Sequence, residues 1–393
     1  MGAASARRLL MIEQGGRGGV TDYTDELTRA LAAEGWAITL ATAADHTYPP
    51  VAGVEVVPIF RYLRDESAIG GALRRRGLGK LVNGLFFLAA LPRLMRLARR
   101  AEIVHSQGWE IPQIGLLAVL CLRLTGTPIV QTAHGTFERA ESFLRTRRVV
   151  RRLTGRLLAR MIVHTEADRL RVREWVGERS VVIPHGEYGG LASKGAGAER
   201  EAARAALGVA AEASATLMYG QLRTDKGLED LIAAVEQVPE THLLIGGKDA
   251  GALAAVRERL QNPALSPRVT LREGFLDMRE TAELFAAADT VALPYRAASQ
   301  SGVLLLAYGF ARPVIIYPAG GMVEAVIDGE TGWICSASEV AALARALADS
   351  ARAGHEECLR RGQRGRELAS ERFSWPAIAA RTGELYREVL GDA

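Results

Sequence analysis

The sequence has 393 residues but little cysteine, little lysine and no long apolar run. Its three cysteines lie far apart and form no CxxC or Cys/His ligand pattern, so we expect neither a disulfide framework nor a structural zinc ion. They are Cys121, Cys335 and Cys358. The apolar stretches 85–91 and 114–122 fall well below the ~20 residues that a membrane span needs, and the run 9–12 is too short for a signal-peptide core. We therefore expect a cytoplasmic protein.

The basic residues are almost all arginine. Only four of the 49 are lysine, namely Lys80, Lys194, Lys226 and Lys248. Codon bias in a GC-rich genome explains such an excess of arginine most simply. A lysine retained against this bias therefore indicates a position that needs the shape of the lysine side chain. The net charge is +4, with 48% hydrophobic and 24% charged residues. This composition excludes long disorder and fibrous repeats, and the length predicts two domains.

Short apolar strands alternate with helices, which predicts βαβ units and parallel sheets. The strands expected in the first half are 9–12, 37–42, 54–59, 102–106, 128–132, 161–164 and 180–183. Those expected in the second half are 215–219, 242–246, 268–272, 289–293 and 313–317, separated by helices 227–236, 250–260, 279–287 and 302–311.

A glycine- and alanine-rich stretch at 187–200 separates the two halves and is the best linker candidate. We therefore expect an α/β protein with two doubly wound, Rossmann-like domains, 1–188 and 196–372, facing each other across a cleft. A C-terminal amphipathic helix, 376–390, could pack back onto the first domain. Ligands of open parallel sheets bind at the carboxyl ends of the strands, where four loops of this chain hold candidate residues.

Two of these loops lie in the first half. The glycine-rich loop 15–20 joins a strand to a helix and could approach a phosphate or sugar, or be only a tight turn. Thr21 stands where a dinucleotide motif has its third glycine, so that site is disfavoured. His134 follows strand 128–132 and could act as a hydrogen-bond partner or acid–base group, or be structural. For the other strand-end histidines we favour a structural role; they are His105, His164 and His185.

The other two loops lie in the second half. Arg223 and Lys226, three residues apart at a helix start, can both point at one anion. Positive charge there opposes the helix dipole, which makes a merely solvated helix start a weak alternative. In the loop 296–303, Ser301 could cap the next helix and the amides beside it could bind a phosphate; a plain N-cap is the alternative. A phosphate-bearing donor on one side and an acceptor on the other would fit this arrangement.

In order and spacing, these motifs resemble the retaining glycosyltransferases of the GT-B type, family 4, over nearly the whole chain. The matching motifs are Gly18-Gly19-Val20, His134, Val182-Ile183-Pro184-His185-Gly186, Gly220-x-x-Arg223-x-x-Lys226-Gly227, Ala288-Asp289-x-x-x-Leu293-Pro294-Tyr295, Pro313-Val314 and Gly320-Gly321-x-x-Glu324-x-x-x-x-Gly329-x-x-Gly332. The resemblance implies transfer of a sugar from a UDP- or GDP-linked nucleotide sugar to a hydroxyl acceptor, which could be a glycan, a glycolipid or a small molecule. It implies no other cofactor.

The resemblance also implies roles for individual residues. His134, Arg223 and Lys226 are the expected catalytic residues, with His134 touching the transferred sugar. The donor-binding residues that it implies are Arg223 and Lys226 on the diphosphate, the amides of Ser301, Gly302 and Val303 beside them, Phe275 and Leu276 at the base, and Gly18 and Gly19 approaching from the first domain.

One feature departs from the family pattern. Members usually have two glutamates eight residues apart around the fourth loop, but those positions hold Ala298 and Leu306. The chain therefore resembles a subgroup without the pair, in which Gln300 could replace one of them. Fixed cations and amides would stabilise the leaving diphosphate, whose phosphate could deprotonate the acceptor on the same face and so retain configuration. Because no DxD-like dyad stands out, we expect metal independence.

Two basic stretches in the first half allow more than one interpretation of the acceptor side. One has Arg74, Arg75, Arg76, Lys80, Arg93, Arg96, Arg99 and Arg100 around the apolar stretch 81–97; the other has Arg145, Arg147, Arg148, Arg151, Arg152, Arg156 and Arg160. They could dock on the anionic inner face of a membrane to reach a lipid-linked acceptor, or be solvated helix faces. Nucleic acid is disfavoured, because no recognition motif is present.

Two other functions stay open at this point. The missing glutamates suggest a non-catalytic binding or partner subunit with the same fold, although retention of Arg223, Lys226 and His134 argues against it. A nucleotide-sugar epimerase could share the architecture. The sequence does not predict the oligomeric state.

Overall fold

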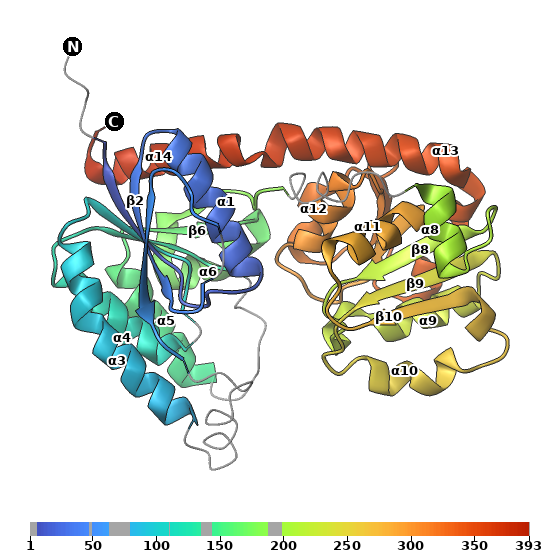
Figure 1. Ribbon diagram of the computed structural model, residues 1–393, viewed down its shortest axis with the longest axis horizontal. Helices are drawn as coiled ribbons and strands as arrows, with labels where there is room; N and C mark the ends of the chain where they lie inside the picture. The colour runs from blue at the N-terminus through green and yellow to red at the C-terminus, as the bar shows by residue number, and fades with distance from the viewer. Residues whose placement is uncertain are drawn as a thin grey trace. The chain divides into compact units, whose positions relative to one another are not determined.

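The computed structural model describes residues 6–46, 49–62, 79–109, 111–134, 144–187 and 199–392, which divide into two compact units. Unit 1 comprises Met1–His185 together with Trp375–Ala393, and unit 2 comprises Gly186–Ser374. Each unit is one parallel sheet with helices on both faces (Figure 1). Most of the predicted linker, at 188–198, lies outside the described residues.

The sheet of unit 1 has seven strands in the order β3-β2-β1-β4-β5-β6-β7, all parallel where they pair. They are β1 (Arg8–Ile12), β2 (Ala37–Ala43), β3 (Val54–Phe60), β4 (Ile103–Ser106), β5 (Ile129–Thr132), β6 (Arg160–Val163) and β7 (Ser180–Val182). All seven strands predicted for the first half are confirmed, with bounds within one or two residues.

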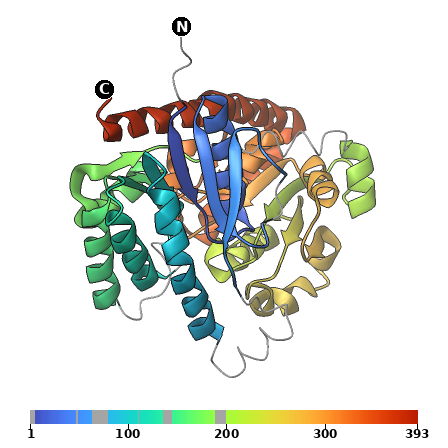
Figure 2. The ribbon, with the colours of Figure 1, turned by 60° about the vertical axis from the view of Figure 1, so that its left-hand side comes forward.

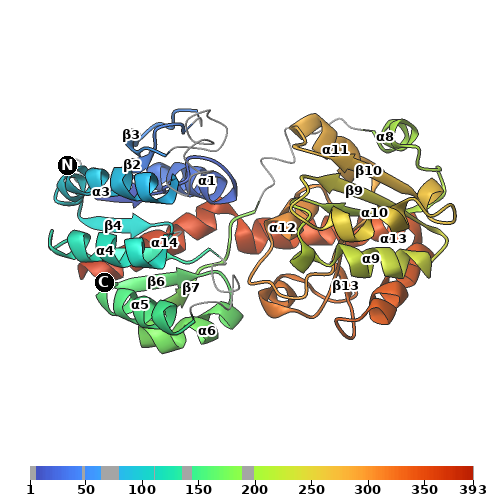
Figure 3. The ribbon, with the colours of Figure 1, turned by 90° about the horizontal axis from the view of Figure 1, so that it is seen from below.

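Alternation along β1 explains the two layers of helices in unit 1. Leu9 and Met11 are buried with α1 (Gly19–Ala33) and α14 (Trp375–Leu390), whereas Leu10 and Ile12 are buried with α3 (Gly79–Ala98) and α4 (Pro112–Arg123). Helices α5 (Leu144–Leu157) and α6 (Glu166–Val176) continue the second layer. Figure 3 shows α3, α4 and α5 side by side over the sheet.

The sheet of unit 2 has six strands in the order β10-β9-β8-β11-β12-β13. They are β8 (Ser214–Tyr219), β9 (Thr241–Gly247), β10 (Val269–Glu273), β11 (Thr290–Leu293), β12 (Val314–Ile316) and β13 (Gly332–Ile334). Five of the six were predicted. The short edge strand β13 was not.

The helices of unit 2 also form two layers. One contains α8 (Arg200–Leu207), α11 (Met278–Ala287) and α12 (Gly302–Gly309), and the other contains α9 (Leu228–Glu236) and α10 (Leu253–Leu260). Helix α13 (Val340–Phe373), which the sequence analysis did not predict, contributes to both layers because its backbone turns at Gly354, where φ is 76°. The course of α13 and α14 is drawn in red in Figure 2.

A buried ion pair joins α8 to the start of β11. The Arg204 guanidinium lies 2.6 Å from Asp289 Oδ2 and also donates to the carbonyls of Ala287 and Ala213. Asp289 accepts further hydrogen bonds from the amide of Ala215 and from His355. Burial alone would raise the pKa of Asp289, but these hydrogen bonds and the neighbouring arginines outweigh it and lower the pKa. Asp289 therefore remains charged inside unit 2.

We expect Asp289→Ala to lower the free energy of unfolding by about 3–5 kcal/mol, because Arg204, only 2% exposed, would stay buried without its counter-ion. Asp349→Ala is the matched control: it removes an exposed ion pair with Arg352, and we expect a change within about 0.5 kcal/mol. Urea unfolding followed by circular dichroism compares the two variants. Equal stability of both would contradict the assigned role of Asp289.

Candidate functional site

Backbone contacts draw together the loops at the carboxyl edge of the unit 2 sheet. A Cβ atom placed on Gly247 would lie 1.8 Å from the carbonyl oxygen of Gly220, and one on Gly227 would lie 2.1 Å from that of Pro294. Both glycines have positive φ, 141° and 75°, which other residues rarely adopt. The loops after β8, β9 and β11 are therefore in direct contact.

Lys226 and Ser301, predicted from separate loops, meet at one residue. Lys226 Nζ lies 3.6 Å from the ring centroid of Tyr295, and the Tyr295 side chain lies close to that of Ser301. Tyr295 is 2% exposed, and its burial raises its pKa to about 12. The neutral, buried ring thus holds the lysine charge above the loop that contains Ser301. The sequence analysis used Tyr295 only as part of a motif and missed this role.

Arg223 is held in place by Asp225. Its Nε donates to Asp225 Oδ1 at 2.8 Å, and its Nη2 donates to the second carboxylate oxygen. The hydrogen bond from Arg223 is the largest factor that lowers the pKa of Asp225. Arg223 is the N-cap of the 3₁₀ turn η2 (Thr224–Lys226), which contains Asp225 and ends at Lys226, so Arg223 and Lys226 belong to one short turn. The carboxylate orients the guanidinium, whose remaining N–H groups can donate to an anion.

The start of α12 lies beside this cation pair. Ser301 is the N-cap, and its hydroxyl accepts from the amide of Leu304 at 3.3 Å. The amides of Gly302 and Val303 belong to the first turn, whose N–H groups have no partner within the helix. A Cβ placed on Gly220 would lie 3.3 Å from the Val303 side chain, so α12 begins against the loop that contains Arg223. Such a helix start favours a phosphate.

Gln300 is the polar group in this loop that lacks a partner. Its Oε1 atom is buried, and in the described part of the chain it accepts no hydrogen bond. Ala298 and Leu306, which occupy the family's glutamate positions, are both apolar and pack into the core of unit 2. Gln300, the residue predicted to replace one of the glutamates, therefore has a hydrogen-bond acceptor that is left unsatisfied.

The predicted base-binding turn has one exposed and one packed side chain. Phe275 is 93% exposed, whereas Leu276 packs against the core. The turn follows β10 and therefore lies at the same carboxyl edge as the cation pair.

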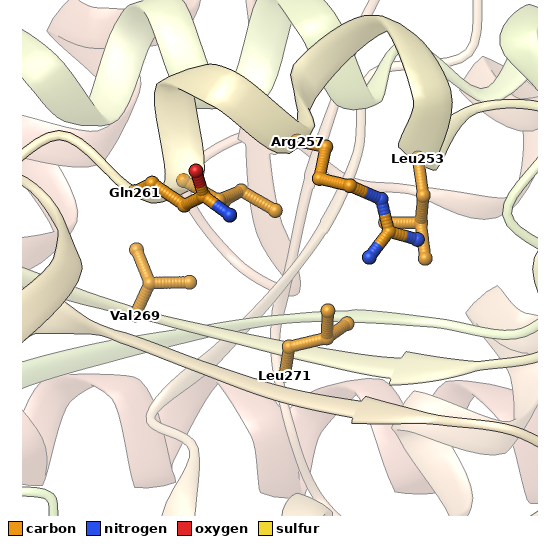
Figure 4. A pocket seen from close by; sticks show the side chains of 6 residues that line it. Leu253, Arg257, Gln261, Val269 and Leu271 are labelled. Carbon is orange, nitrogen blue, oxygen red and sulfur yellow. The ribbon is translucent and has the colours of Figure 1, made fainter.

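A separate apolar pocket of about 230 Å³ lies between α10 and β10, lined by Leu253, Arg257, Leu260, Gln261, Val269 and Leu271 (Figure 4). None of the predicted donor residues lines it.

In unit 1, Glu13 explains how the glycine-rich loop is held. Its buried carboxylate accepts from the amide of Gly16 at 2.9 Å, from the amide of Gly15 and from the hydroxyl of Thr42. The loop's first amides are thus already bound by an internal anion. Gly18 and Gly19 instead border open space, since a Cβ atom on either would meet no atom within 4 Å. The predicted approach to a ligand can involve only this second half of the loop.

His134 is linked to two polar partners within unit 1. Its Nε2 lies 2.8 Å from Gln107 Oε1, and its Nδ1 lies 3.3 Å from His164 Nε2. His164 Nδ1 must carry a proton, because it donates to the carbonyl of Ile183 at 3.0 Å. In neutral His164, Nε2 is then an acceptor, so His134 donates from Nδ1 and its own Nε2 is left as an acceptor. A neutral His134 therefore requires Gln107 to turn its amide nitrogen towards it.

The other strand-end histidines lie in or next to the hydrogen-bonded group formed by Gln107, His134 and His164, and their contacts fit the structural role predicted for them. His164 and His185 both contact the Tyr23 ring, and His105 hydrogen-bonds to Thr132 and to the Tyr386 hydroxyl of α14. Burial lowers the pKa of His105 to about 3 and that of His164 to about 4, and it lowers the pKa of His134 well below its ordinary value. Unit 1 therefore presents neutral imidazoles at this edge.

Two family models match the chain. The model described as "Glycosyl transferases group 1" matches residues 213–352, and the model described as "Glycosyl transferase 4-like domain" matches residues 18–186.

Among curated proteins, a D-inositol 3-phosphate glycosyltransferase of Corynebacterium efficiens is 30% identical, over 95% of this chain and 91% of that protein. The corresponding protein of Mycobacterium tuberculosis H37Ra is 28% identical over 74% of this chain, which spans only 62% of that relative's length.

Solved structures share the fold at lower identity. Sucrose-phosphate synthase from Thermosynechococcus elongatus superposes with a TM-score of 0.73 at 23% identity, covering 98% of this chain and 100% of that one. Anabaena HepE in complex with UDP gives a TM-score of 0.73 at 19% identity, covering 97% and 100%.

The buried histidines make stability depend on pH. The folded pKa values of His105 and His164 lie below the ordinary 6.5, so their contribution is complete above pH 6.5 and is lost as the pH falls towards 4. We expect the free energy of unfolding to fall in this window by about 1.4 kcal/mol per pH unit for each of the two.

Denaturation at pH 7 and pH 5, followed by tryptophan fluorescence, measures this slope, since four of the five tryptophans lie in unit 1. His164→Asn should remove one histidine's share of the slope, whereas His46→Asn, outside the cluster, should keep it. A wild-type protein equally stable at both pH values would refute the assignment.

Proposed function

This chain belongs to the group 1 family of glycosyltransferases and has their GT-B fold, and from this premise we propose that it is a retaining enzyme that transfers a sugar from a nucleotide diphosphate sugar to a hydroxyl group. One observation supports the donor assignment above all. Tyr295 joins Lys226 and the start of α12 into a single positively polarised site at the carboxyl edge of unit 2. A nucleoside diphosphate provides the negative charge that this site suits.

In the proposed complex, Arg223 and Lys226 bind the two phosphates and the amides of Gly302 and Val303 donate to the same oxygens. Gln300 donates to or accepts from a sugar or ribose hydroxyl in place of a glutamate. We propose UDP as the nucleotide first, because a structural neighbour was solved with UDP and with UDP-glucose; GDP is the alternative.

The proposed reaction places its charge on the leaving diphosphate. As the bond to the sugar breaks, negative charge grows on the β-phosphate, where preorganised cations and amides stabilise it more than in the ground state. The same phosphate takes the proton of the acceptor hydroxyl, which then attacks from the face that the leaving group occupied. The configuration is retained, no protein nucleophile is needed, and Arg223 and Lys226 take the neutralising role that a divalent metal has elsewhere.

We propose that unit 1 supplies the acceptor side through His134 and the open part of its glycine loop. The acceptor is a glycan, a glycolipid or a small polyol. The similarity to D-inositol 3-phosphate glycosyltransferases favours a phosphorylated polyol such as inositol phosphate.

The absence of a glutamate pair favours a second candidate, a non-catalytic subunit that binds the nucleotide sugar without turning it over. Turnover of UDP-glucose with an acceptor panel separates the two, because such a subunit would show UDP-dependent thermal stabilisation and no product. An epimerase would convert the donor sugar with no acceptor present.

We expect Lys226→Ala to lower kcat about 10²–10³-fold, because the variant removes a charge that acts on the leaving group. Arg259→Ala is the control, since this arginine pairs with Glu236 away from the site, and its kcat should equal that of the wild type. Unchanged turnover in Lys226→Ala would contradict the proposed contact with the diphosphate. Addition of EDTA should leave the wild-type rate unchanged.

We expect Phe275→Ala to weaken UDP binding by about 1–3 kcal/mol, the range for stacking of a base on an aromatic ring. Because the side chain is 93% exposed in the unliganded protein, its removal should not change the melting temperature without ligand. Calorimetric titration with UDP measures the effect. A wild-type Kd in the variant would show that only the backbone of the turn contacts the base.

A further inference from the structure

The helices α3, α4 and α5 of unit 1 carry most of the exposed large apolar side chains in the described part of the chain. Of the fifteen exposed large hydrophobic side chains among the described residues, ten lie on α3 and α5 or on α4 and its flanking residues. They are Leu81, Leu85, Phe86, Leu88, Ile111, Leu117, Leu120, Leu124, Val149 and Leu153. Soluble proteins rarely leave so many apolar side chains together without a partner.

Helix α3 contributes most to this face. Leu81, Leu85 and Leu88 follow one another at helical spacing on one side and are 62%, 57% and 46% exposed. By length and composition alone, the segment Leu81–Ala98 could cross a membrane, with a mean hydropathy of 1.4 and 28% of its residues buried. The sequence analysis noted the apolar stretch 81–97 but weighed only the uninterrupted runs 85–91 and 114–122 against the length of a membrane span. The opposite side of α3 packs into the core of unit 1 through Phe87, Leu91 and Leu94, so the folded unit does not allow α3 to span a bilayer.

A basic groove adjoins the same helix. The second half of α3 and the edge strand β3 enclose a cavity of about 380 Å³, lined by Arg93, Arg96 and Arg100 with Val56 and Pro58. Arg93 donates to the carbonyl of Pro58 at 3.5 Å. In the described part of the chain, none of the three guanidiniums forms an ion pair, and Glu55, which also lines the groove, pairs with none of them. Among the described residues, three guanidiniums and one carboxylate line this groove, so it has space and an excess of positive charge for an anion.

The second basic stretch is different. Arg148 and Arg152 of α5 both pair with Glu174 of α6, and Arg151 lies over the Trp175 ring at 4.8 Å. These contacts favour the solvated-face interpretation for this part of α5. Arg74, Arg75 and Arg76 lie outside the described residues. Among the described residues of the two basic stretches, most of the guanidiniums without an ion pair therefore lie on α3 or directly after it.

We propose that α3 docks unit 1 on an anionic phospholipid surface, with its leucines in the interface and a lipid phosphate in the groove of Arg93, Arg96 and Arg100. A leucine stripe continuing into arginines on the same helix matches an interfacial helix, whose arginines extend to the headgroups while the apolar side enters the acyl boundary. A second copy of the chain fits less well, because a symmetric contact through α3 would bring unpaired guanidiniums of both copies together. This docking does not depend on the proposed sugar transfer.

Vesicle sedimentation with the full chain tests the proposal. We expect binding to vesicles of phosphatidylcholine with 30% phosphatidylglycerol at low salt, weaker binding at high salt and little binding to phosphatidylcholine alone. The variant R93Q/R96Q/R100Q should lose on the order of a hundredfold in partitioning. The charge-matched control is R257Q/R345Q/R352Q, which changes three exposed arginines of unit 2 and should bind as the wild type does.

The variant L81Q/L85Q/L88Q tests the apolar half and should also reduce partitioning while leaving the UDP-induced thermal shift of unit 2 unchanged. Absence of wild-type binding to the anionic vesicles at low salt would overturn the proposal, as would wild-type binding by the arginine variant. Self-association of the wild type that the leucine variant abolishes in the absence of lipid would assign the face to a second copy instead.

Discussion

The proposed donor site of unit 2 depends on backbone-to-backbone contact at the carboxyl edge of its sheet. Where Gly227 meets the carbonyl of Pro294 and Gly247 meets that of Gly220, a Cβ atom would overlap the neighbouring loop. This contact brings the strand-end loops close enough for the Tyr295 ring to lie under Lys226 and for α12 to begin beside Gly220. The cations and the helix amides can share one anion because the chain is this closely packed beneath them.

The two units differ in the charge of the side chains at the carboxyl edges of their sheets. Unit 2 orients Arg223 with Asp225 and Lys226 with Tyr295, which in the proposed complex would let the two cations act on an anion with little reorganisation. Unit 1 buries His105, His134 and His164, which lowers their pKa values and keeps them neutral. A neutral His134 with an acceptor at Nε2 suits a sugar hydroxyl, which would replace the bond to Gln107, and would not compete with the cations for the diphosphate.

The sequence predicted the sheets better than the contacts between loops. Strand–helix alternation was enough to place twelve of the thirteen strands, because buried parallel strands are short apolar runs; β13, with three residues, was too short to show this pattern. Helix α13 was missed although its sequence is helical in character. In the sites, Tyr295 could not be identified because its contact with Lys226 joins residues far apart in the chain. Glu13 was missed although it accepts hydrogen bonds from the nearby amides of Gly15 and Gly16. Ser301 could be identified, because capping acts on the next three residues.

The absence of the glutamate pair agrees with the electrostatics of the proposed reaction. A carboxylate accepts stronger hydrogen bonds from sugar hydroxyls than an amide does, but it would also place negative charge beside the departing diphosphate. With Ala298 and Leu306 in those positions and Gln300 neutral, this loop brings no carboxylate from the glutamate positions to offset Arg223 and Lys226. In the proposed complex, a hydroxyl of the nucleotide sugar would donate to the buried Oε1 of Gln300, which accepts no hydrogen bond in the described part of the chain, so a neutral contact would contribute to recognition of the sugar.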